Sequence, residues 1–222
     1  MTKTSTMRLR IRRAFLPLLA LLAAGPITAQ VDPHFSQYYV YPSWLNPALT
    51  GIFDGQYRVS GVYRSQWGSI TTPFTTYGAT GEITTDKNIN LGVSILKQTA
   101  GDGGYGYTTA YGSVSYTGVK FGPEQTKRLV FGLQAGMIQR RFDRSKMTFG
   151  DQWNPVFGYN PGTPSTEVLS RTAASAFDIG AGVLYFDAKP GQKANLYGGL
   201  SVSHLTKPED KFGATGDARF PM

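Results

Sequence analysis

Strict alternation of apolar and polar side chains is the feature that most constrains how this chain folds. The segment 56–67, QYRVSGVYRSQW, places Tyr57 and Tyr63 on one parity and Arg58 and Arg64 on the other. Because successive side chains of a strand point to opposite faces of a sheet, this segment predicts a strand with one apolar and one charged face. Its length is close to the ~9–11 residues with which a tilted strand crosses a membrane.

The same period of two recurs along the rest of the chain. Further strands are predicted over 75–83, 90–97, 107–118, 128–139, 176–186 and 195–205. Glycine is frequent on the polar parity of these segments, and no comparable stretch shows helical periodicity. We therefore expect an all-β fold, an antiparallel transmembrane β-barrel whose strands occupy residues 55–205.

The predicted connections differ in length. Outer-membrane barrels have short periplasmic turns and longer external loops. The short predicted turns are 84–89, 119–127 and 187–194, and the longer ones are 98–106 and 140–175. Bacterial single-chain barrels have even strand numbers from eight upward. Seven strands therefore predict part of a larger barrel, with residues 206–222 as a loop or truncated tail.

The first 29 residues have the composition of a cleavable signal peptide. Five basic residues precede the apolar run 14–24, and the small residue Ala29 precedes the expected cleavage point. The alternative is a buried core helix, because the run is too short to span a bilayer. Without this leader, 17 basic residues stand against 14 acidic ones, so charge gives no argument for a nucleic-acid partner. The chain has no cysteine, which excludes disulfides and thiolate metal sites.

The segment 30–54, between the leader and the first strand, combines prolines with aromatic residues. Pro33, Pro42 and Pro47 remove backbone donors and favour extended preceding residues, so the segment is not expected to join the sheet. Its candidate contact residues are Phe35, Tyr38, Tyr39 and Trp44. The two alternatives for them are plug-like packing at the periplasmic mouth of the barrel and docking of a periplasmic partner.

Several short motifs, taken together, resemble one known family. Residues 32–51, DPHFSQYYVYPSWLNPALTG, resemble the opening of the PorP/SprF outer-membrane proteins of Bacteroidetes, which belong to the type IX secretion and gliding machinery. The resemblance covers roughly residues 31–152 and weakens toward residue 205. It continues through YRSQW (63–67), PFTTY (73–77), LGVSIL (91–96), AGDGG (100–104), FGLQAG (131–136) and QRRFDRSKMTFGDQ (139–152).

This resemblance implies a non-enzymatic, outer-membrane role without cofactors. Family members support secretion or surface attachment of cargo proteins such as adhesins with a conserved C-terminal domain. The implied partners are outer-membrane lipid, periplasmic and lipoprotein subunits of the machinery, and that adhesin domain. The alternative from another functional class is a passive outer-membrane transporter or channel for small amphipathic solutes.

One basic cluster stands out beside the predicted long loop. It consists of Arg140, Arg141, Arg144 and Lys146. The alternatives are a solvated strand end and a contact surface for lipopolysaccharide phosphates, which suit the arginine fork.

Three charged residues lie on the polar parity of the first two strands: Arg58, Arg64 and Glu82. Facing inward, they avoid the ~2–4 kcal/mol that a charge costs at mid-depth on a lipid-facing strand. They predict either a structural ion pair or the polar lining of a conduit.

The remaining motifs point away from catalysis. Residues 101–106 fit G-x-G-x-x-G, but the strand-like YTTAYGSVSY follows them, where a dinucleotide site requires a helix. His34 and His204 are the two histidines of the chain, and a hydrolase would need a nucleophile beside one of them. Ser201 and Ser203 have the opposite parity to His204.

Aromatic residues along the predicted strands suggest girdles at the two membrane interfaces. The expected girdle residues are Tyr57, Tyr63, Trp67, Tyr77, Tyr107, Tyr111, Tyr116 and Tyr185. A soluble carbohydrate-binding surface is the alternative use of such residues.

Overall fold

The computed structural model describes residues 32–33, 35–70, 72–85, 87–101, 103–167, 171–191, 194–210 and 220–221. The predicted leader and His34 lie outside these residues. The chain divides into the units 1–31 and 32–222, and every described element belongs to the second unit.

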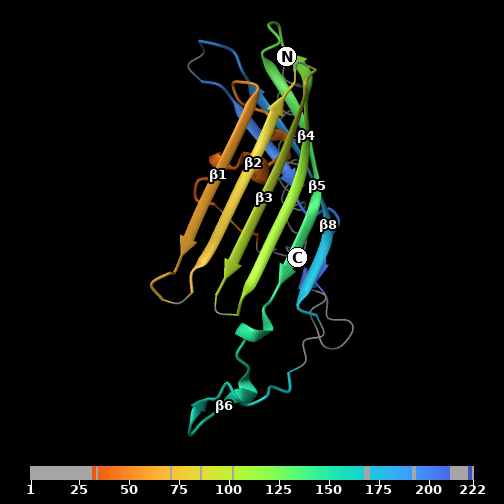
Figure 1. Ribbon diagram of the computed structural model, residues 1–222. Coiled ribbons are helices and arrows are strands. Elements are labelled where there is room, and N and C mark those ends of the chain that lie inside the picture. Colours follow the sequence, from red (N-terminus) through yellow and green to blue (C-terminus); the bar gives the residue numbers. More distant parts are fainter. Residues whose placement is uncertain are drawn as a thin grey trace, which may run out of the picture. The chain divides into compact units, whose positions relative to one another are not determined.

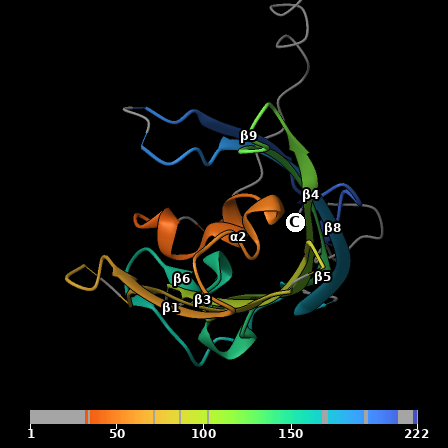
Figure 2. The same ribbon diagram turned by 90° about the horizontal axis from the view of Figure 1, so that it is seen from above.

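Seven antiparallel strands form one sheet in sequence order, which confirms the seven strands predicted from alternation (Figure 1). They are β1 (Tyr57–Gln66), β2 (Phe74–Thr84), β3 (Ile89–Ala100), β4 (Tyr105–Phe121), β5 (Lys127–Arg141), β8 (Ala173–Asp187) and β9 (Tyr197–Val202). The sheet curls into a half-barrel, and β1 and β9 are its edges in the described part of the chain (Figure 2).

The other elements are short. They are η1 (Tyr38–Val40), α2 (Pro42–Leu45), η2 (Pro47–Leu49), η3 (Arg144–Lys146), η4 (Gly150–Gln152), β6 (Trp153–Asn154), β7 (Gly158–Tyr159), β10 (Glu209–Asp210) and β11 (Phe220–Pro221). The strands β6 and β7 pair with each other, as do β10 and β11. Among the described helices, none has the length and apolar character to cross a membrane.

The convex face of the sheet is apolar and exposed, whereas the concave face is polar and covered. Val59 is 86% exposed and Val93 66%, both on the convex side, while the inward Thr80 and Glu82 are buried. A water-soluble sheet would bury its apolar face, so this inverted distribution is typical of strands that face lipid.

The apolar belt of the convex face has a clear limit toward the connection 142–172. Along β5 the belt includes Leu133 and Met137, and the next outward side chain is the polar Gln139. The register places Gln139 in one row with Lys97 and Tyr77. Polar and tyrosine side chains therefore mark the level at which the belt ends.

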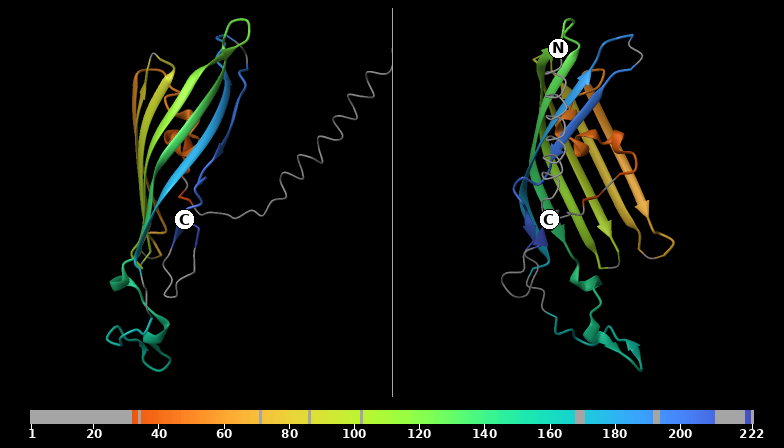
Figure 3. Two further views of the ribbon diagram at one scale, coloured as in Figure 1. Left: turned by 90° about the vertical axis from the view of Figure 1, so that its right-hand side faces the viewer. Right: turned by 180° about the vertical axis from the view of Figure 1, so that it is seen from behind.

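The connections are sorted less clearly than the sequence suggested. At one end of the sheet they comprise 67–73, 101–104 and 142–172, and at the other 85–88, 122–126 and 188–196. The loop predicted over 98–106 shrinks because β3 and β4 extend to Ala100 and Tyr105. Only 142–172 is much longer than the rest, and it contains η3, η4 and the β6–β7 pair (Figure 3).

Residues 32–33 and 35–54, here called the inner segment, lie against the concave face within the curve of the sheet (Figure 2). Two groups of buried apolar side chains join it to the strands. One includes Phe35 and Tyr41, and the other is built around Ala48. The core of this half-barrel is thus formed between the inner segment and the sheet.

Candidate functional site

The interface between the inner segment and the concave face is built from buried apolar side chains and hydrogen bonds. The prolines of the inner segment determine its local conformation. Pro42 is the first residue of α2 and Pro47 the first of η2, positions where a missing backbone N–H costs nothing. Asn46 caps η2, because its side chain accepts a hydrogen bond from the backbone nitrogen of Ala48 at 2.8 Å. The prediction that this segment stays out of the sheet agrees with the described elements, but its helical turns were not anticipated.

The aromatic residues of the inner segment divide into two pairs. Phe35 is buried and packs edge-on against Tyr41, with ring centroids 5.5 Å apart. Trp44 packs on the same cluster and donates its indole hydrogen to the Pro33 carbonyl. Tyr38 and Tyr39, in contrast, remain 58% and 66% exposed. The structure therefore separates the four candidate contact residues into two that face the sheet and two that do not.

Polar contacts extend along the inner segment across the sheet. The Tyr41 hydroxyl donates to the Ile95 carbonyl of β3 at 3.0 Å. The Asn46 amide donates to the carbonyls of Val183 in β8 and Leu200 in β9. The Thr50 carbonyl accepts from the Ser115 hydroxyl of β4 at 2.7 Å. The segment is thus tied to four strands rather than resting at one mouth of the barrel.

Glycines on the inward-facing positions of the strands leave the space that the inner segment occupies. A Cβ at Gly132 would overlap the backbone of Ala48, and one at Gly182 would overlap the Asn46 side chain. A Cβ at Gly92 would lie 2.9 Å from the Thr50 methyl group. The glycine-rich polar parity seen in the sequence is therefore the surface on which the inner segment packs.

A buried charged group holds the beginning of the inner segment. His204 follows β9 and places Nε2 2.9 Å from Oδ2 of Asp32. Its Nδ1 lies 2.9 Å from Oδ2 of Asp178 in β8, an ion-pair contact rather than a well-aligned hydrogen bond. The hydroxyl of Tyr111 donates to Asp178 at 2.8 Å, and that of Tyr107 donates to Asp32 at 3.2 Å.

This arrangement defines the charge of the histidine. Carboxylates only accept hydrogen bonds, and each imidazole nitrogen faces one. We assign the imidazolium form, because one positive charge between the buried Asp178 and the partly buried Asp32 offsets part of their desolvation. Asp32, Asp178 and His204 are named below as the His204 cluster. Both ring nitrogens of His204 are occupied, and the described residues contain no group of three metal-ligating side chains arranged for an ion.

A second ion pair, whose carboxylate is buried, holds the other end of the inner segment. Nη2 of Arg58 lies 2.7 Å from Oε2 of Glu82, and the Glu82 side chain is 1% exposed. The same carboxylate accepts a hydrogen bond from the backbone nitrogen of Gly51 at 2.8 Å. Arg64 faces Thr76 in the register, away from this pair. Of the three residues predicted as lumen lining, two therefore form an ion pair that also binds the inner segment.

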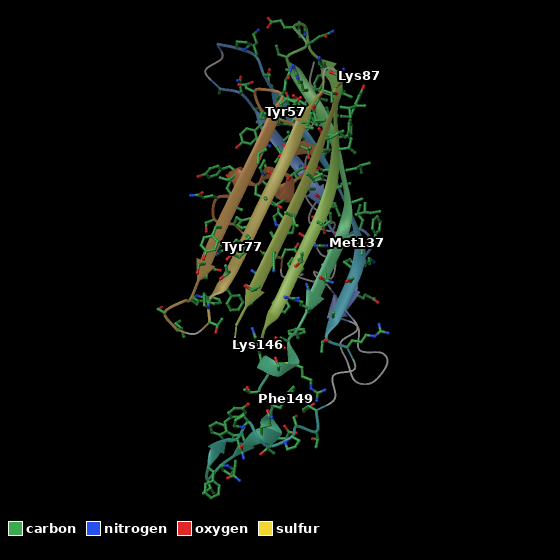
Figure 4. The ribbon with its side chains drawn as sticks, in the orientation of Figure 1. Tyr57, Tyr77, Lys87, Met137, Lys146 and Phe149 are labelled. Atoms are coloured by element: carbon green, nitrogen blue, oxygen red, sulfur yellow. The ribbon has the colours of Figure 1, made fainter. Side chains whose placement is uncertain are left out.

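The predicted basic cluster is split by the pleat of β5. Arg140 faces inward, with its guanidinium over the Tyr107 ring at 5.4 Å. Arg141 faces outward, and Arg144 and Lys146 follow it in η3. Figure 4 shows Lys146 beyond the end of the strands. Three of the four residues therefore remain together in one cleft.

Two carboxylates of the connection 142–172 are stabilised in their charged form. The pKa of Asp143 is lowered chiefly by the hydrogen bond from the Ser145 hydroxyl and, to a smaller extent, by the bond from the Ser145 backbone N–H. The backbone N–H of Thr166 and nearby hydroxyl groups lower the pKa of Asp151. Both carboxylates are exposed; Asp143 caps η3, whereas Asp151 accepts hydrogen bonds from Ser165 and Thr166, later in the same connection.

The structure also tests the predicted aromatic girdles and the glycine motif. Tyr107 and Tyr111 are buried on the concave face, so their assignment to the girdles was wrong. Tyr63 and Tyr77 do face outward, with ring centroids 5.1 Å apart. The glycine motif at 101–106 connects two antiparallel strands rather than a strand and a helix.

The His204 cluster was missed by reasoning from the sequence. Asp178 carried a usable signal, since it is a carboxylate on an inward parity otherwise occupied by Gly180 and Gly182. An inward carboxylate at that depth requires a partner. Nothing in the sequence pointed to Asp32 or His204 as that partner, because they lie far away along the chain.

Comparison with protein families gives a match over most of the chain. The model of the family described as type IX secretion system membrane protein PorP/SprF matches residues 27–219. No curated protein and no solved structure matches the chain.

Proposed function

Because the chain belongs to the PorP/SprF family of type IX secretion system membrane proteins, we propose that it supports secretion or surface attachment of cargo proteins at the outer membrane. The family match over 27–219 carries this proposal. The proposed cargo proteins are adhesins that use the type IX pathway. The proposed process that they serve is gliding motility. The role is structural, and we assign it no catalytic step.

The distribution of side chains supports a place in a bilayer. The convex face carries a continuous belt that includes Val59, Val93 and Leu133, each more than half exposed. Charged side chains such as Glu82 and Asp178 are instead buried on the concave face. Lipid outside and polar contacts inside are the conditions under which this sheet avoids unsatisfied groups.

The inner segment supports docking rather than free passage of solutes. It lies along the concave face and is fixed there by the His204 cluster and by Glu82. We propose that it acts as a plug, in which Phe35 and Trp44 are internal contacts. Tyr38 and Tyr39 keep exposed rings and are the proposed contacts for periplasmic or lipoprotein subunits or for the adhesin C-terminal domain.

Deletion of the gene in its host tests the proposed function. We expect proteins with the type IX C-terminal domain to be retained in the cell and to return to the surface when the chain is supplied again. Unchanged secretion and surface attachment of every such protein would contradict the proposal. Ion conductance or solute uptake by the chain in liposomes would instead favour a passive transporter.

Site-specific photo-crosslinking tests the proposed contact residues. A photoreactive residue at Tyr39 is expected to capture another subunit of the machinery or its cargo. The matched control is the same residue at Val93, which is similarly exposed but lies on the convex belt. Equal capture from both positions would remove the specific role of Tyr39.

A further inference from the structure

A cleft of about 660 Å³ lies at the end of the sheet that carries the connection 142–172. The ends of β3, β4, β5 and β8 form its walls. Arg141, Arg144 and Lys146 line it, and Asp143 is the one acidic residue among its described lining residues. The cleft therefore presents an excess of positive charge.

The acidic residue is already engaged within its own turn. Asp143 accepts hydrogen bonds from the hydroxyl of Ser145 at 2.6 Å and from its backbone nitrogen at 3.1 Å. Arg144 donates from Nη2 to the Glu167 carbonyl at 2.9 Å, which leaves further donors on the guanidinium. The charge of the cleft is thus suited to an anionic ligand with several acceptor atoms.

Two glycines shape the cleft around these side chains. A Cβ at Gly104 would lie 2.6 Å from Cβ of Asp143 and 3.1 Å from Cδ of Lys146. A Cβ at Gly106 would lie 3.1 Å from Cγ of Arg141. Because these positions carry no side chain, the basic residues lie close against the strand ends.

The level of the cleft along the strands independently indicates that its ligand is part of the membrane surface. On the convex side of β5, the belt includes Met137, continues to the polar Gln139, and reaches Arg141 next. Tyr63 and Tyr77 lie in the row of Gln139. Tyrosines and polar residues mark the membrane interface, so Arg141 is at the level of lipid headgroups.

We propose that this cleft binds a phosphate group of lipid A, the anionic glycolipid of the outer leaflet. Long connections of outer-membrane barrels lie outside, which places 142–172 in that leaflet. Arg141 and Arg144 offer guanidinium forks that match phosphate oxygens in pairs, and Lys146 adds a point charge. Arg140 takes no part, because it faces the concave side.

The test measures binding of diphosphorylated lipid A to the full chain in detergent micelles. The triple variant R141Q/R144Q/K146Q is expected to bind at least about tenfold more weakly, because it loses the charge-assisted hydrogen bonds. The matched control is K87Q/K120Q/K127Q, which removes the same charge from the opposite end of the sheet. Figure 4 shows Lys87 at that end. We expect the control to retain the affinity of the unchanged chain.

A second variant distinguishes the effect of the shape of the cleft from the effect of its charge. Thr172→Trp narrows the cleft without altering any ionisable group and is expected to weaken lipid A binding as well. Heat-dependent gel mobility verifies that each variant is folded. Unchanged affinity in both the triple variant and T172W, or equal loss in the control, would overturn the proposal.

The source of the phosphate is distinguished by two further probes. Dephosphorylated lipid A is expected not to bind measurably to the cleft, and inorganic pyrophosphate is expected to compete only at much higher concentration. Retained binding of the dephosphorylated lipid would overturn phosphate recognition. Pyrophosphate binding as tight as that of lipid A would overturn the lipid as the ligand.

Discussion

The Nε2 atom of His204 lies 2.9 Å from Oδ2 of Asp32, which joins residues 172 positions apart in the sequence. This contact holds the first described residue of the inner segment to the chain beyond β9. His204 also contacts Asp178 in β8, so the inner segment and the strands share one buried charge. The stability of the half-barrel and the position of the inner segment are therefore coupled.

Substitution of His204 by Gln tests that coupling. The buried Asp178 and the partly buried Asp32 lose their positive partner, and we expect the free energy of unfolding to fall by about 3 kcal/mol. The measurement is urea unfolding of the refolded chain in micelles. Ser203→Ala, at the adjacent position, serves as the control and should be nearly neutral. Asp32→Asn combined with His204→Gln should cost less than the sum of the single changes, and strict additivity would argue against the ion pair.

Substitution of Gly132 by Ala tests the close approach of the inner segment. The added methyl group would overlap the backbone of Ala48, so the segment must shift. We expect faster chymotrypsin cleavage near Tyr38 and Tyr39 in the folded chain. Gly112→Ala is the matched control, because its Cβ would lie 4.0 Å from the nearest atom, the Ala135 carbonyl oxygen. Equal cleavage rates for both variants would show that the segment does not pack on Gly132.

Two ion pairs of equal length allow a test of burial. Arg58–Glu82 and Lys189–Glu124 both measure 2.7 Å, but Glu82 is 1% exposed and Glu124 57%. We expect Glu82→Gln to lower the free energy of unfolding by about 2 kcal/mol, since it also weakens the bond from Gly51. Glu124→Gln should change it by less than about 1 kcal/mol. Similar effects in denaturant titrations would contradict the role given to Glu82.

An arginine on the convex belt tests contact with lipid. Val93→Arg places a charge at mid-belt and is expected to lower stability in vesicles by about 2–4 kcal/mol. Val156→Arg is the control, because Val156 is 78% exposed in the connection 142–172. Unfolding titrations in phosphatidylcholine vesicles give the comparison. A neutral V93R would mean that the convex face does not contact lipid.

The titration of Asp143 has a definite direction. Its pKa lies below the usual carboxyl value, chiefly because the Ser145 hydroxyl donates to it. A lowered pKa in the folded state contributes stability above the unfolded-state pKa, and this contribution is lost as the pH falls through the folded-state pKa. Ser145→Ala should therefore raise the pKa measured by carbon NMR of the carboxyl group. An unchanged pKa would exclude the hydroxyl as its main cause.

Alternation alone determined much of this protein. The period of two along segments such as 56–67 identified all seven strands of the sheet and separated the face of Val59 from that of Glu82. It succeeded because side-chain direction in a strand is set locally by the backbone. The motifs beginning at residues 32–51 likewise pointed to the family, which the match over 27–219 confirms.

The tertiary structure decided what the inward faces do. The sequence placed Asp178 and Gly132 on a polar parity, but only the fold showed that one meets His204 and the other the backbone of Ala48. The fold also placed Tyr107 and Tyr111 in the interior, and it put the side chains of Arg140 and Arg141 on opposite faces of the sheet. These relationships depend on contacts between residues far apart in sequence, and the curl of the sheet around the inner segment, rather than any local preference, brings them together.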